Sequence, residues 1–568
     1  MRNVKNLFGM AVMATALVAC SSNDDLASNG HEGNQTGEAY ASFRINLPTT
    51  NGTRVAGDPT FDGGDKNEYA VKDAALLLFQ KEGSDFKFKE VVDLGNMEPW
   101  TASKPGGGGI TTTAKLTAKI TTAEVGANKG YYALIVLNNN EGTDQKIIYP
   151  TPEQTYADWS QKASNANATN YLKYDKGFFM ANAPKYVAGA PETLVEIKNI
   201  YASKQQAENS TATTVYVERG LAKVSLASSS VKHVDIKNGN YAGDKVDIEG
   251  WTLDVTNTKT YPVHVTEGLW ADIWKTTVTS DATASMDRFH DTKLTEFPRV
   301  YWGLDPNYST DLATVEACNS EFKMASKDDF KTGEEAKKAQ YCLENTFDIN
   351  HMVQGQTTRV LFSAKYTPDG FTAGETFYKM GNSSQLWNAT KVEAQIKAKA
   401  MEVLRETDET KVTVTLAAPA NNLTEAGVHF VAAANVTHVG GPALTTDDVD
   451  KINAKLGFKK ATPKDAAVGL STYESGVSYY VARVKHFNEL TPWVPGNDTY
   501  AGNNANWLGR YGVLRNNWYE LSVSSVSGPG YPDVPKVNPT DPDDVNDQYI
   551  NVEVKILDWA KRSQSIGL

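Results

Sequence analysis

The sequence predicts an all-β protein built from β-sandwiches. Short segments that are rich in β-branched and aromatic residues, or that alternate between apolar and polar residues, recur along the chain. Turn-forming stretches such as 104–109 and 527–532 separate them. Amphipathic helical patterns are few. Many short strands with long polar connections are typical of β-sandwiches.

Composition limits the classes of protein that the chain can belong to. Its 568 residues are enough for two or three domains. It has 56 basic and 68 acidic residues and a net charge of −12, whereas proteins that bind nucleic acid normally present a basic face. Three cysteines exclude a disulfide-built scaffold, and eight dispersed histidines offer little for a metal site. We therefore predict no nucleic-acid partner, no metal and no cofactor.

The first twenty residues have the pattern of a bacterial export signal. A basic start precedes an apolar run over 7–19, which is too short for a permanent membrane span. The run ends Leu-Val-Ala-Cys, the pattern of a lipobox, in which the thiol of the cysteine takes a diacylglycerol. We predict a lipoprotein signal peptide over 1–19, acylation at Cys20 and a polar tether after it. The alternative is an ordinary signal peptide with a chance cysteine.

An alternating segment follows the tether. Over 39–47 one face carries Ala39, Ala41, Phe43, Ile45 and Leu47 and the other face is mostly polar, which predicts a strand with one buried face. The loop after it is small and polar and contains Arg54-Val55, in a setting where proteases cut. Cleavage there would remove the anchor together with the strand and expose a groove with unpaired backbone groups. The less favoured alternative is that Arg54 is an uncut loop arginine.

The body of the chain divides near 200–213, which is polar and poor in apolar residues. We predict a propeptide over 20–54, an N-terminal sandwich over 55–213 and a larger C-terminal sandwich over 214–548. Two helices are expected, at 390–405 and at 445–457, the second ending at Gly457. The predicted strands of the body lie at 114–120, 131–139, 214–226, 251–257, 358–366, 411–416, 478–484, 519–526 and 550–557.

The C-terminal segment 549–568 alternates like segment 39–47. Its strand places Ile550, Val552, Val554 and Ile556 on one face, whose burial is worth on the order of 6–12 kcal/mol gross. Inserted into a neighbour's vacated groove, such a strand would form a head-to-tail joint that can build a filament. Equally, 549–557 can be the last strand of the chain's own sandwich. The tail 558–568 would then be free to cross, with Ile566 and Leu568 as its apolar anchors.

Several motifs, in order, resemble the fimbrillins of Bacteroidales, the type V pilus subunits, and most of all the major shaft subunit of the short (minor) fimbria. The resemblance covers essentially the whole chain. It rests on the lipobox at Cys20 and on segments of the body and of both ends. These are FRINLPTTNGTR, GFFMAN (177–182), RGLAKVSL (219–226), RVYWGLDPNY (299–308), YCLENTF (341–347), YGVLRNNWYELSV (511–523) and VEVKILDW (552–559).

The resemblance implies two transthyretin-like β-sandwich domains and a location at the bacterial surface. It implies export as an outer-membrane lipoprotein, maturation by an arginine-specific protease at Arg54-Val55, and polymerisation by donor-strand exchange through the C-terminal segment. It also implies accessory anchor and tip subunits, and adhesion to host cells and other bacteria with biofilm formation. Export would also permit a disulfide between Cys318 and Cys342, which the sequence leaves undecided.

No motif of an enzyme is present, so we predict a non-enzymatic protein. The acidic stretch 541–547 lacks the late glutamate of a calcium loop and is expected to be a linker. Two alternatives remain open. One is a different class of function, a surface lipoprotein that binds glycans or peptides and never polymerises. The other is a fimbrial subunit with a tip or anchor role. The aromatic residues that could form a sugar platform, although core packing is favoured, are Trp302, Tyr308, Trp507, Tyr511, Trp518 and Tyr519.

Overall fold

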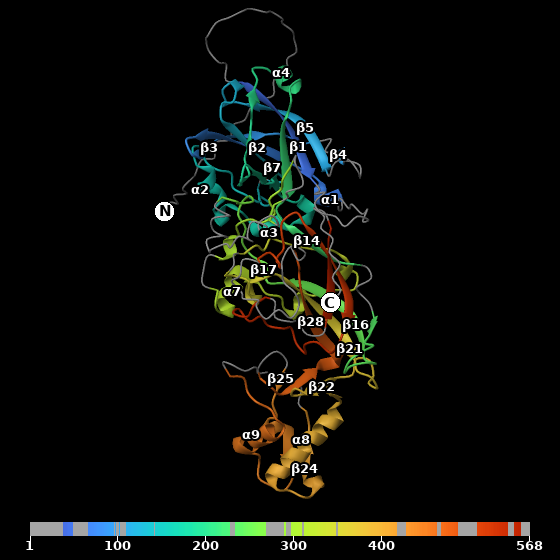
Figure 1. The fold of residues 1–568 in the computed structure, drawn as a ribbon. Helices are drawn as coiled ribbons and strands as arrows, with labels where there is room; N and C mark the ends of the chain where they lie inside the picture. The colour runs from blue at the N-terminus through green and yellow to red at the C-terminus, as the bar shows by residue number, and fades with distance from the viewer. Residues whose placement is uncertain are drawn as a thin grey trace, which may run out of the picture.

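The computed structural model shows an elongated, mainly β protein, whose three parts follow one another along its long axis (Figure 1). The parts are an N-terminal sandwich, a C-terminal sandwich and a small tip with two helices at the far end. The predicted all-β class is confirmed. The structure describes residues 38–48, 66–95, 97, 101–102, 110–140, 142–227, 233–267, 289–290, 297–308, 312–347, 350–416, 428–462, 467–486, 508–543 and 550–557.

The N-terminal sandwich is one folded-back sheet with the strand order β3-β2-β7-β8-β13-β1-β5-β4. One face of β2 and β7 packs against β1 and β5 and encloses an apolar core, while the other face is covered by α2 and α3. The bounds are β1 Ala39–Pro48, β2 Ala74–Glu82, β3 Asp85–Asp93, β4 Thr101–Ala102, β5 Ile110–Ile120, β7 Tyr131–Leu137, β8 Met180–Asn182 and β13 Thr213–Arg219, with α1 Lys66–Tyr69, α2 Tyr156–Ser160, α3 Ala168–Tyr171 and α4 Lys204–Glu208. Short strands at its margins are β6 Gly126–Ala127, β9 Lys185–Val187, β10 Ala190–Glu192, β11 Val195–Glu196 and β12 Asn199–Ile200.

The C-terminal sandwich stacks two sheets, β20-β14-β29-β30 and β15-β16-β21-β28, around a second apolar core. Trp251 and Tyr480 are fully buried between the sheets. The bounds are β14 Ala222–Leu226, β15 His233–Asp235, β16 Lys245–Asp254, β17 Thr256–Asn257, β18 Phe322–Lys323, β19 Lys331–Thr332, β20 Gln340–Cys342, β21 Arg359–Thr367, β28 Val477–Arg483, β29 Trp518–Val526 and β30 Ile550–Leu557, with α7 Val315–Glu321.

The tip is an insertion between two strands of the C-terminal sandwich, β21 and β28. It has a core of its own, in which α8 and α9 pack on short strands. Both helices lie where the sequence predicts them, and α9 is capped by Thr445, whose hydroxyl accepts from the Asp448 N–H, and is followed by Gly457 at φ +78°. The bounds are β22 Phe377–Met380, β23 Leu386–Trp387, α8 Ala389–Leu404, β24 Val412–Val414, β25 Val428–His429, β26 Val436–His438, α9 Thr446–Lys455 and β27 Leu470–Tyr473.

The predicted strand over 214–226 is two strands that belong to different sandwiches. β13 pairs with β1 and β8, whereas β14 pairs with β20 and β29. Gly220 joins them where a Cβ atom would lie 2.7 Å from the ring of Tyr171, so a side chain does not fit there. The domain boundary at residue 213 stays a prediction, and the residues just after it pair in the N-terminal sheet.

Buried charges join the two sandwiches at this crossing. Glu218 accepts from Arg299 Nη2 at 2.8 Å and lies 2.5 Å from His264 Nδ1, with all three side chains at most 1% exposed. Burial opposes the ionisation of Glu218, but His264 and Arg299 outweigh it and hold its pKa below the ordinary value. Nearby, Glu68 of the N-terminal part pairs with Lys223 at 2.7 Å. These contacts fix one sandwich against the other.

Candidate assembly site

Strand β1 occupies the interior of the N-terminal sheet, as Figure 1 shows beside β5. It pairs antiparallel with β5 from Ala39 to Pro48 and parallel with β13 from Phe43 to Asn46. Among the described strands, β5 has only β1 and the two-residue β4 as neighbours. Loss of β1 would therefore separate β5 from the rest of the sheet.

The apolar face of β1 is buried as predicted, whereas burial on its polar face is mixed, because Arg44 is exposed but Ser42 and Asn46 are only 4% and 2% exposed. Ala39, Ala41, Phe43, Ile45 and Leu47 are at most 1% exposed and form part of the N-terminal core. Burial of the three large side chains contributes roughly 5–9 kcal/mol gross. The small residues come first and the large ones last, so a replacing strand has to match two small and three large positions.

The outer face of β1 is held much less firmly. Arg44 is exposed, and Ser42 borders a cavity of about 620 Å³ that is also lined by Tyr201 and Thr213. Few side-chain hydrogen bonds hold the outer face of β1. One of them joins Thr113 Oγ1 to Asn46 Oδ1 at 2.7 Å. Main-chain ladders and one apolar face therefore hold β1, and any strand with the same alternation can supply both.

Strand β30 is the last strand of the chain's own C-terminal sandwich. It pairs antiparallel with β29 from Ile550 to Leu557 and forms the edge of that sheet. The side chain of Val552 is partly buried against the C-terminal core. Of the two arrangements that the sequence leaves open, the structure adopts this one. The assignment of Ile550, Val552, Val554 and Ile556 as donor residues stays a prediction, because it requires β30 to leave β29.

Several predicted site residues lie outside the described residues. They are the acylation site Cys20, the cleavage bond Arg54-Val55, and the tail residues Ile566 and Leu568. Their roles stay predictions. What the structure places is the two strands next to them, β1 before the cleavage bond and β30 before the tail.

The predicted aromatic residues do not form an exposed sugar platform. Trp302, Tyr511 and Tyr519 are buried, and Tyr519 OH lies 2.8 Å from His486 Nδ1. The Trp518 indole N–H donates to Ser225 Oγ at 2.7 Å, and Lys223 Nζ lies 3.5 Å from the centre of its ring. Tyr308 OH donates to Gln356 O at 2.7 Å, and Trp507 lies outside the described residues. These described side chains serve packing.

Cys318 and Cys342 are buried free thiols rather than a disulfide. Burial raises the pKa of Cys318 to about 11 and that of Cys342 to about 12, so both remain protonated at neutral pH. In the described part of the chain, no group of three His, Cys, Asp or Glu side chains is arranged to hold a metal. None of the helices in the described ranges has the length and hydropathy of a membrane span.

A known protein family matches the C-terminal part of the chain. Residues 471–565 match the model of "Major fimbrial subunit protein type IV, Fimbrillin, C-terminal". The C-terminal part of the chain is therefore similar to a fimbrillin domain. The matched region runs from β27 through β28 and β29 to β30. The resemblance to fimbrillins is thus confirmed, while the narrower resemblance to the shaft subunit of the short fimbria stays a prediction.

Two solved structures have some likeness to the chain. A candidate cell-adhesion protein from Parabacteroides distasonis ATCC 8503 is 10% identical at a TM-score of 0.36, covering 92% of this chain and 99% of that one. A fimbrilin from Porphyromonas gingivalis W83 is 13% identical at a TM-score of 0.35, with 92% and 99% covered. At TM-scores this low, the family assignment depends on the fimbrillin domain alone. A sequence comparison with curated proteins finds no match.

Proposed function

We propose that this chain is a structural, non-enzymatic subunit of a fimbrial shaft that polymerises by donor-strand exchange. Cleavage after Arg54 releases β1 together with the acylated N-terminus, and a strand of the next subunit takes its place. The observation that carries the proposal is the position of β1. It is interior to its sheet, buried on one apolar face, and joined to its neighbours mainly through ladders that another strand can reproduce.

The tail 558–568 is the donor that this arrangement favours. It follows directly on β30, which keeps its place in the subunit's own sandwich. Ile566 and Leu568, two residues apart, supply apolar anchors that can fill two of the large positions of β1, and Trp559 and Ala560 are further apolar residues of the tail. Such a joint connects unlike surfaces of successive subunits, so it propagates into a filament instead of closing into a ring. Donation of Ile550–Leu557 is the second possibility and requires β30 to detach from β29.

The remaining steps follow from the sequence and the fimbrillin domain. The precursor is an outer-membrane lipoprotein acylated at Cys20, and an arginine-specific protease cuts the Arg54-Val55 bond. The mature subunit joins a surface fimbrium together with anchor and tip subunits. The fimbrium serves adhesion to host cells and other bacteria and the formation of biofilm.

A disulfide that locks β1 in place tests the exchange directly. Arg44 and Lys115 face each other across β1 and β5, and both side chains are exposed, so replacing them by cysteine leaves the core intact. The double variant R44C/K115C, oxidised and treated with protease, should keep the cut β1 and fail to form filaments in electron micrographs. Reduction should restore assembly. Filaments that grow equally well with the disulfide closed would show that β1 does not leave.

The cleavage site has a matched control in the same segment. Arg54→Ala should leave the precursor folded and block filament growth, whereas Arg44→Ala should mature normally because Arg44 lies in a strand paired on both sides. N-terminal sequencing of assembled fibres should begin at Val55. Fibres whose subunits retain residues upstream of Val55 would contradict the proposal. Gold labelling confined to fibre ends would assign the chain to a tip or anchor role.

A further inference from the structure

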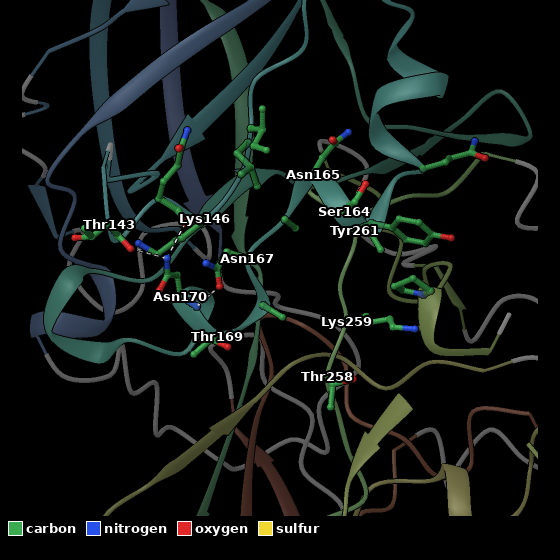
Figure 2. Close-up of a pocket in the computed structure, with 18 of the residues that line it drawn as sticks. Thr143, Lys146, Ser164, Asn165, Asn167, Thr169, Asn170, Thr258, Lys259 and Tyr261 are labelled. Atoms are coloured by element: carbon green, nitrogen blue, oxygen red, sulfur yellow. Dashed lines mark hydrogen bonds between the residues drawn. The ribbon is translucent and has the colours of Figure 1, made fainter. Parts of the chain in front are cut away.

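A groove of about 900 Å³ lies where loops of the N-terminal sandwich meet a segment of the C-terminal sandwich (Figure 2). Residues 142–143, 145–148, 161 and 163–170 supply most of its lining, and segment 258–261 runs alongside them. The volume is near the upper end of the roughly 300–1,000 Å³ found for ligand sites, so the groove has room for more than one sugar ring. We name it the junction groove.

The junction groove is held open by contacts beneath it. Tyr171 is fully buried, and its hydroxyl donates to Pro262 O at 2.8 Å, which ties the two walls together. Ile147, which belongs to the lining, packs in the same buried apolar cluster as Val263. A site that exists before its ligand arrives spends less free energy on reorganisation.

The lining carries polar groups with spare hydrogen-bonding capacity. The side chains of Gln161, Ser164 and Thr169 form no hydrogen bond within the described part of the chain, and Gln161, Ser164 and Thr169 are exposed. Main-chain groups of the same wall are already used, since Ile148 N–H donates to Asn165 O at 2.8 Å and Asn167 N–H to Lys146 O at 2.6 Å. Recognition therefore falls to side-chain amides and hydroxyls, and these two main-chain pairs give a peptide no free strand edge to extend.

The charge of the lining favours a neutral ligand. No carboxylate lines the groove, although the chain as a whole carries a net charge of −12. Its two lysines are already engaged, Lys146 Nζ by Asn138 O at 2.7 Å and Lys259 Nζ by Glu321 Oε1 at 2.6 Å. A cation therefore meets no carboxylate in the groove, and an anion meets only lysines whose amines already have a partner.

Apolar surface lies beside these polar groups. Ile148 is 59% exposed, an unusual position for a large aliphatic side chain, and Tyr261 and Pro306 also line the groove. An aromatic ring and aliphatic carbons next to amides and hydroxyls match a sugar ring, which has C–H faces and a hydroxyl rim.

We propose that the junction groove binds a neutral oligosaccharide. The binding is a property of the folded subunit and is independent of polymerisation, so it can be measured on the uncut chain. In a filament the same groove would recur in every subunit, and weak single-site affinity would then add up through multivalency.

The test is a printed array of neutral and acidic oligosaccharides probed with the purified uncut chain. Saturation-transfer NMR with the strongest neutral hit follows. Ser164→Trp fills the groove without removing a hydrogen bond within the described part of the chain, and Tyr261→Ala removes the ring. Asn382→Trp, an exposed tip residue outside the groove, is the matched control. Circular dichroism establishes that each variant is folded.

We expect at least one neutral glycan to bind saturably. Its affinity should fall about tenfold or more, roughly 1.4 kcal/mol, in Ser164→Trp and Tyr261→Ala and stay unchanged in Asn382→Trp. Three results would overturn the proposal: no neutral glycan bound by the array, a bound glycan unaffected by Ser164→Trp, or groove-dependent binding of acidic glycans only. The locked R44C/K115C variant should bind like the parent, which separates this test from that of strand exchange.

Discussion

Glu218 illustrates, at the scale of single residues, how this protein fixes its two sandwiches together. The carboxylate is 1% exposed and contacts both Arg299 and His264, which lie in the segment between β17 and β18. A buried charge without a partner is expensive, so each member of this group needs the others. The arrangement constrains the angle between the sandwiches more than it adds to net stability.

Glu218→Gln should lower the free energy of unfolding by about 3–5 kcal/mol, because Arg299 loses its buried counter-charge. Urea unfolding followed by tryptophan fluorescence measures the change. Glu208→Gln is the matched control, since Glu208 forms a surface pair with Lys204 and should shift the midpoint by less than about 1 kcal/mol. Equal effects for the two variants would show that the junction charges do not support the fold.

Lys146 gives a prediction with a defined pH window. Burial lowers the pKa of its amine to about 8, against about 10.4 in an unfolded chain. Between these values the unfolded chain binds a proton that the folded chain does not, so this residue makes stability rise with pH across that window. Lys146→Met should remove a slope of about 1.4 kcal/mol per pH unit between pH 8 and pH 10. Parallel stability profiles for parent and variant would contradict it.

At the scale of the element, β1 should be essential to the precursor and irrelevant to the fibre. Phe43→Ala should destabilise the uncut precursor by about 3–5 kcal/mol, because it empties a fully buried site. Arg44→Ala, on the exposed face, should change it by less than about 0.5 kcal/mol. Fibres that do assemble from Phe43→Ala should melt like the parent fibres. Weaker fibres would mean that residue 43 remains in the assembled subunit.

Elements with a strong repeating pattern could be predicted from the sequence. The two-residue alternation of β1 and β30 and the 3.6-residue stripe of α8 each report a buried face, and the structure has these elements at or near the predicted bounds. The break at Gly220 was missed, because a strand pattern continues through it while the reason for the glycine is a contact with Tyr171, 49 positions away in sequence. The local sequence pattern gives no information about contacts between residues so far apart in the chain.

The two candidate sites differ in the same respect, because one follows a local sequence pattern and the other does not. The buried face of β1 comes from one short continuous segment with a regular pattern. The junction groove instead combines residues between 142 and 170 with residues 258–261, and these two segments share no sequence motif. Asparagine, serine and threonine in such loops are expected for turns alone. Only the packing of one sandwich on the other makes them neighbours, so the sequence offered no signal for this groove.

At the scale of the whole molecule, the two proposed joints lie on different sandwiches. The groove that β1 fills is in the N-terminal sandwich, and β30, which precedes the tail in sequence, forms an edge of the C-terminal sandwich. The buried junction around Glu218 connects them. In the proposed fibre, a load applied through one joint would pass to the next through this buried junction. The tip with α8 and α9 lies at the end away from β1.

The proposed exchange makes a prediction for the chain of residues 55–557, which lacks both β1 and the tail 558–568 and should therefore stay monomeric. Without β1, strand β5 loses its long neighbour, so this chain should unfold at a lower temperature than the uncut precursor. A peptide of residues 39–48 added in trans should restore stability by about 2.7 kcal/mol at a hundred times its Kd, since it binds the folded state only. The same peptide with Ile45→Asp should have no effect, because it would bury an unpaired charge. A peptide of residues 558–568 should stabilise the chain as the native peptide does and compete with it. If neither peptide raises the melting temperature, the groove does not accept a strand from outside, and head-to-tail exchange cannot be what joins the subunits.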